Sequence, residues 1–107
     1  MPQLVIYTRD RTCPDQTLVR QCLKEWGLPA IEINISHEVD AVPRLAELIG
    51  CLAIPTLMVT DEHDQPIEPL APLTAFQSVR NIDRGAVISE PSREGLRRFL
   101  QKHGLLS

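Results

Sequence analysis

The feature that most constrains this 107-residue chain is a cysteine placed between a short apolar run and a segment with helical periodicity. The apolar run is Leu4–Tyr7, and Cys13 follows it after a polar loop that contains Arg9 and Arg11. Beyond Pro14, apolar side chains recur every three or four residues. This order predicts a strand, a loop and a helix that meet at Cys13.

Cys13 is predicted to be a functional thiol at the start of that helix. The unpaired N–H groups of a first helical turn favour an anion just before them, and a thiolate is such an anion. Arg9 and Arg11 add positive charge nearby. Pro14 suits the first helical position because it has no N–H to leave unsatisfied. The competing interpretation is that Cys13 is a small buried hydrophobic residue.

Composition and charge are those of an ordinary globular protein. The chain is 43% hydrophobic and 23% charged, and its length fits one domain over residues 1–107. Its net charge of −3 argues against nucleic acid as a partner. No apolar run approaches the roughly 20 residues of a membrane helix. The start of the sequence lacks the basic region and long apolar core of a secretory signal, so we expect a cytoplasmic location and no membrane partner.

The three cysteines, at positions 13, 22 and 51, are expected to be thiols in a reducing cytoplasm. Neither a C-x-x-C pair nor a zinc-type spacing of Cys and His is present in the sequence, so no metal site is predicted. Cys22 falls on the apolar stripe of the first helix and is expected in the core. His37, His63 and His103 all have polar neighbours and are interpreted as surface residues.

Periodicity and turn residues predict the remaining elements. A fourth strand is assigned to Pro66–Leu70, which its two prolines confine to an edge of the sheet, while Ala86–Ile88 could add a short extended piece. The stretch Leu73–Glu90 has no sustained period. The predicted order is β-α-β-α-β-β-α, with helices at Pro14–Trp26, from Pro43 to Gly50 and from Ser92 to Gly104, and strands at Leu4–Tyr7, Ala30–Ile35, Ile54–Thr60 and Pro66–Leu70.

Two motifs resemble the thioredoxin superfamily, and its glutaredoxin-like branch most closely. They are Val-Ile-Tyr-Thr-Arg running into Thr-Cys-Pro, and Ala-Ile-Pro-Thr-Leu further on. The resemblance covers residues 3–70 and 91–104 and implies an α/β, thioredoxin-like fold, with a four-stranded mixed sheet flanked by helices. In that family a cysteine caps the first helix, and a cis proline before the third strand faces it. The matching positions are Cys13 and Pro55.

The resemblance also implies a substrate site. Ile54 would present its backbone to a substrate peptide, often glutathione, and Arg9 lies near the position of a basic residue that contacts the glycine carboxylate of glutathione. Ser92 and Arg93 open the last helix, where the family holds the other carboxylate on backbone amides. The expected set of residues that bind glutathione or a peptide is Arg9, Arg11, Pro14, Gln16, Ile54, Pro55, Ser92 and Arg93.

The sequence departs from that family in two places. Gln16 stands where a second cysteine is usual, so dithiol exchange within one motif is impossible. The family's glycine pair before the last helix is reduced to Gly85, and residues 73–90 look like an insertion. From there, Arg80 and Arg84 could lie over the active site or be surface charges.

The leading hypothesis is a single-cysteine exchange. Cys13 would attack a glutathionylated protein, and free glutathione would then regenerate the thiol. A less favoured route has Cys51 resolving the intermediate. The alternatives are a redox-silent module that binds a protein or peptide, and an iron–sulfur cluster carrier. The carrier is disfavoured because carriers with one cysteine resemble Cys-Gly-Phe-Ser, whereas this chain has Cys-Pro-Asp-Gln.

Overall fold

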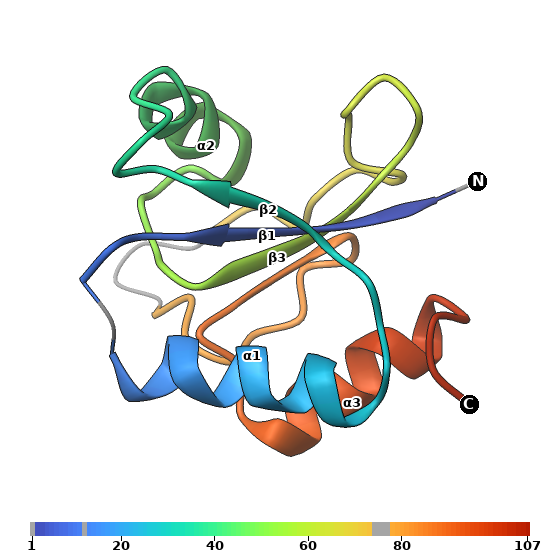
Figure 1. Ribbon diagram of the computed structural model, residues 1–107. Coiled ribbons are helices and arrows are strands. Elements are labelled where there is room, and N and C mark those ends of the chain that lie inside the picture. Colours follow the sequence, from blue (N-terminus) through green and yellow to red (C-terminus); the bar gives the residue numbers. More distant parts are fainter. Residues whose placement is uncertain (1, 12, 74–77) are drawn as a thin grey trace.

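A computed structural model describes residues 2–11, 13–73 and 78–107. Thr12 of the Thr-Cys-Pro motif and residues 74–77 of the expected insertion lie outside the described residues. Four strands form one sheet in the order β2-β1-β3-β4 (Figure 1). The predicted α/β fold, its mixed sheet and the order β-α-β-α-β-β-α are confirmed. The elements are β1 (Gln3–Thr8), α1 (Pro14–Glu25), β2 (Ile31–Asn34), α2 (Ala41–Ile49), β3 (Thr56–Thr60), β4 (Val87–Ser89) and α3 (Arg93–Lys102).

The register of the sheet determines which loops meet. Strand β1 runs parallel to β2 and antiparallel to β3, and β3 runs antiparallel to β4. Tyr7, near the end of β1, pairs with Thr56, the first residue of β3. The loop that leaves β1 and the turn that enters β3 therefore begin at the same edge of the sheet. In Figure 1 this is the left-hand end, where α1 also begins.

Side-chain alternation along β1 separates two cores, because successive residues of a strand point to opposite faces. Leu4 and Ile6 pack with α1 and α3, while Val5 and Tyr7 pack with α2. In Figure 1, α2 lies above the sheet and α1 and α3 lie below it. A sheet covered on both faces explains why β1 and β3 are almost entirely buried.

Helix α1 forms where its apolar spacing predicted, with Val19, Cys22 and Leu23 buried against the sheet. It begins at Pro14 as expected, and Gly27, with a φ of 65°, follows its end. That backbone conformation is open to glycine because it has no Cβ. In the described part of the chain, no helix is both long and apolar enough to span a membrane.

Two predicted boundaries were wrong. The fourth strand is β4 (Val87–Ser89), and the assigned stretch Pro66–Leu70 contributes one isolated bridge, between Pro66 and Thr60. A proline has no N–H to donate to a ladder, which explains why that stretch does not form a strand. Helix α2 begins at Ala41, two residues before Pro43.

Candidate functional site

Cys13 lies at the first boundary of α1, as predicted. Its backbone is extended, with φ −137° and ψ 164°, and it is the N-cap residue before Pro14. The thiol is free and partly exposed, and its side chain makes no capping hydrogen bond. The orphan N–H groups of the first turn favour negative charge at this position. Because the thiol is partly exposed, the alternative of a fully buried Cys13 is wrong.

The side chain of Gln16 supports the loop that precedes Cys13. Its side chain is fully buried, its Nε2 donates to the carbonyl of Arg9 at 3.0 Å, and its Oε1 accepts from the N–H of Arg9, also at 3.0 Å. Both polar ends of the amide are thus engaged by one backbone residue. The expectation that Gln16 contacts substrate is corrected, because the amide supports the loop from inside the protein.

Arg9 and Arg11 differ in setting. Arg9 is partly buried, and its Nε is enclosed without a hydrogen-bond partner among the described residues. Arg11 is exposed in the loop, as is Pro14 at the start of α1. A guanidinium has further N–H donors besides Nε and is suited to pairing with a carboxylate.

The Ile54–Pro55 peptide bond is cis and lies at the same edge of the sheet as the Cys13 loop. Pro55 directly precedes Thr56, which pairs with Tyr7, so it lies level with Thr8. The carbonyl of Pro55 accepts a hydrogen bond from the N–H of Glu90 at 2.7 Å. No hydrogen bond of the Ile54 backbone is found within the described part of the chain, and the residue is 6% exposed.

Arg80 reaches the start of α1 from the expected insertion. Its Nη1 and Nη2 lie 2.7 and 2.9 Å from the two carboxylate oxygens of Asp15, two residues after Cys13. Its Nη1 also lies 3.9 Å from the carboxylate of Glu90. The pairing with Asp15 raises the pKa of Arg80, and Glu90 and Cys13 act in the same direction. This contact places Arg80 beside the first turn of α1, next to the predicted site, although its side chain is 58% exposed.

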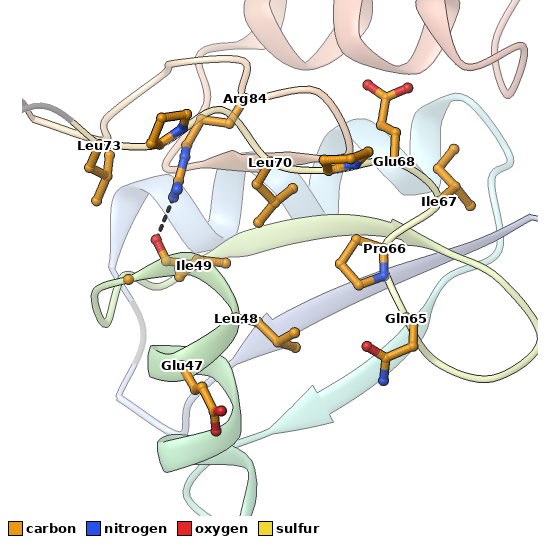
Figure 2. Close-up of a pocket in the computed structure, with 13 residues that line it drawn as sticks. Glu47, Leu48, Ile49, Gln65, Pro66, Ile67, Glu68, Leu70, Leu73 and Arg84 are labelled. Carbon is orange, nitrogen blue, oxygen red and sulfur yellow. Dashed lines mark hydrogen bonds between the residues drawn. The ribbon is translucent and has the colours of Figure 1, made fainter.

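Arg84 lies elsewhere and is neither at the active site nor a surface charge. It is 7% exposed, its Nε donates to the carbonyl of Ala71 at 2.9 Å, and its Nη1 donates to the carbonyl of Ile49 at 2.5 Å. Figure 2 shows this side chain reaching down to the last residue of α2. A guanidinium there satisfies a helix-end carbonyl and complements the negative end of the helix dipole.

The pocket drawn in Figure 2 is separate from Cys13. It has a volume of about 690 Å³ and lies between the end of α2 and the segment 65–73, with Leu48, Pro66 and Leu70 among its lining residues. None of the predicted substrate-binding residues lines it. The candidate site is therefore the open edge around Cys13 and Pro55.

The beginning of α3 is already occupied from within the protein. The N–H of Ser92 donates to Oδ1 of Asn81 at 2.9 Å, and the Oγ of Ser92 accepts from the N–H of Gly95 at 3.0 Å. The Arg93 guanidinium pairs with the carboxylate of Glu25 and lies over the ring of Trp26. The N–H of Ser92 is thus already paired, and the expectation that Ser92 and Arg93 meet a substrate carboxylate stays a prediction.

The other two cysteines are also free thiols. Cys22 is fully buried in the core below the sheet, as predicted, and burial raises the pKa of its thiol. Cys51 is partly buried and packs against the core around α2. Across the described ranges, no cluster of three or more potential metal-ligating side chains is found.

Three residues that the sequence analysis did not single out shape the site: Asp15, Asn81 and Glu90. Asp15 carried a signal, since an acidic residue in the first turn of a helix directly follows the cysteine motif. Asn81 and Glu90 carried none, because they belong to a stretch without periodicity. Both have a positive φ, 59° and 44°, which no pattern in the sequence indicated.

A comparison with known protein families supports the same site. The model of the family described as Glutaredoxin matches residues 4–63, more than half of the chain. The matched span includes Cys13 and the Ile54–Pro55 bond, whereas Arg80, Asn81 and Ser92 lie beyond it. Searches among curated proteins and among solved structures found no match. Together with the sheet, the match confirms the resemblance and the thioredoxin-like fold.

Proposed function

The chain belongs to the glutaredoxin family, and from this premise we propose that it is a thiol–disulfide oxidoreductase that reacts through the single thiol of Cys13, with glutathione as co-substrate. The observation that carries the proposal is the free, partly exposed Cys13 at the start of α1, whose preceding loop leaves the sheet at the same edge as the cis Ile54–Pro55 bond. A thiolate in such a place is the attacking species in disulfide exchange.

The proposed reaction has two steps. The Cys13 thiolate attacks the glutathione sulfur of a glutathionylated protein, the protein–glutathione disulfide breaks, and the protein thiolate leaves and takes a proton from water. A glutathione thiolate then attacks the glutathione sulfur of the Cys13 mixed disulfide, which releases oxidised glutathione and restores the Cys13 thiolate. We place this reaction in the cytoplasm, where glutathione keeps thiols reduced.

The roles of the neighbouring residues follow from their positions. The backbone of Ile54 would pair with the extended substrate, and Pro55 would hold that edge in place. The partly buried Arg9 and the exposed Arg11 would meet a carboxylate of glutathione. Gln16 cannot supply a second thiol, so resolution of the mixed disulfide falls to glutathione from solution.

A second candidate is a redox-silent module that docks a peptide along the same edge, and Gln16 in place of a second cysteine favours it. A deglutathionylation assay of the wild type, Cys13→Ser and Cys51→Ser decides between the two. We expect Cys13→Ser to fall to the background rate and Cys51→Ser to stay near the wild type. Equal rates for the wild type and Cys13→Ser would reject the enzyme and favour the docking module. Loss of activity in Cys51→Ser would assign the second step to Cys51.

A further inference from the structure

Three charged side chains, those of Arg80, Asp15 and Glu90, meet beside the first turn of α1. The Arg80 guanidinium holds Asp15 with two hydrogen bonds, of 2.7 and 2.9 Å, and comes within 3.9 Å of Glu90. Asp15 lies two residues after Cys13, and the N–H of Glu90 donates to the carbonyl of Pro55. Arg80 therefore connects the two halves of the site.

The segment that carries Arg80 is held in place by its own contacts. The N–H of Asn81 donates to the carbonyl of Ser89 at 2.8 Å, while Oδ1 of Asn81 accepts from the N–H of Ser92. Arg80 itself forms a parallel bridge with Ser89 at the end of β4. These contacts hold the backbone at Arg80 and Asn81 against the end of β4 and the start of α3, while the Arg80 side chain is 58% exposed.

Two carboxylates, those of Asp15 and Glu90, accompany Arg80 near the start of α1. A like charge nearby disfavours a thiolate, and the side chains of Asp15 and Glu90 are only 21% and 30% exposed, so water screens them incompletely. Arg9 and Arg11 of the loop and Arg80 carry the opposing positive charges. Arg80 is the one among them that bonds directly to the carboxylate two residues from the sulfur.

From this geometry we propose that Arg80 is a positioning residue, which favours the thiolate form of Cys13 by neutralising Asp15 and, more weakly, Glu90. The proposal rests on the proposed function only in taking Cys13 as the reacting thiol. It assigns a role in the reaction to a segment beyond the part of the chain that matches the glutaredoxin family.

The test is the pH dependence of Cys13 alkylation, with the modified residue identified by mass spectrometry. We expect Arg80→Gln to raise the pH midpoint of alkylation by about half to one unit, which slows alkylation near neutral pH by about three- to tenfold. Asp15→Asn should lower the midpoint or leave it unchanged. In the double variant Asp15→Asn/Arg80→Gln the midpoint should return most of the way to the wild-type value, because the unpaired carboxylate is then absent. Lys24→Gln, the same loss of charge at the other end of α1, should have no effect.

Two results would overturn the proposal. One is an unshifted midpoint in Arg80→Gln, and the other is a double variant shifted as far as Arg80→Gln alone, which would show that Arg80 acts only on structure. If Arg80→Gln does not fold, Arg80→Lys replaces it. A midpoint near that of the wild type then supports a role for the positive charge, and a large upward shift refutes that role. Because alkylation needs no turnover, its outcome is separate from the Cys13→Ser assay that tests the proposed function.

Discussion

Replacing Gln16 by methionine tests whether the buried amide holds the Cys13 loop through hydrogen bonds or through packing. Methionine has nearly the length and volume of glutamine and no polar group, so the side chain still fills its fully buried position. What the variant loses is the pair of 3.0 Å hydrogen bonds to the N–H and the carbonyl of Arg9.

The size of the effect follows from those two bonds. Each hydrogen bond contributes roughly 0.5–1.5 kcal/mol net, and leaving its partner unpaired costs more where water cannot reach it. The backbone of Arg9 is partly buried, so water replaces some of the lost bonding. The apolar methionine removes the cost of burying an amide and offsets a further part. We therefore expect Gln16→Met to lower the free energy of unfolding by about 2 kcal/mol.

Urea unfolding followed by circular dichroism measures this change, and an unchanged slope against urea would show that both proteins unfold in the same way. Gln16→Ala serves as a companion, because it removes volume as well as hydrogen bonds and should be less stable still. A Gln16→Met protein within about 0.5 kcal/mol of the wild type would refute the reasoning, since it would show that packing rather than the two hydrogen bonds holds the loop.

Two other predictions concern the start of α3 and the core around α2. Asn81→Gly keeps the positive φ of 59° and frees the N–H of Ser92. This change should raise the preference for glutathione disulfides over disulfides that lack the γ-glutamyl residue by about two- to fivefold. An unchanged ratio in competition assays would show that no carboxylate reaches α3. Burial raises the pKa of the Tyr7 phenol above its ordinary value of 10.0, so above that pH the unfolded chain ionises first and folding loses stability. In unfolding measured between about pH 9 and 11, Tyr7→Phe should therefore lose less stability than the wild type, and parallel pH profiles would contradict this.

Local patterns in the sequence were enough to predict the first half of the fold. The apolar run of β1, the helical spacing after Cys13 and the proline before β3 are signals confined to a few neighbouring residues. They were sufficient to place Cys13 at the start of a helix and Pro55 at the start of a strand. Both positions depend on local backbone geometry, which a proline at or beside the position favours strongly.

The second half depends on contacts between distant parts of the chain, and sequence patterns do not report these. Residues 66–70 and 86–88 were both candidates for the last strand, and pairing with β3 selects the second. Gln16 was assigned to substrate because its position relative to Cys13 is visible in the sequence, whereas its burial beneath Arg9 is not. Arg80 and Arg84 looked alike as charges in an irregular stretch, yet one meets a carboxylate and the other a helix end.

The ion pair of Arg80 with Asp15 joins side chains 65 positions apart in the chain. The first helix and its Asp15 carboxylate therefore obtain their partner from a segment close to the other end of the chain. If Arg80 acts as proposed, a chain cut short before residue 80 would keep the cysteine and the carboxylate and lose the arginine that pairs with it.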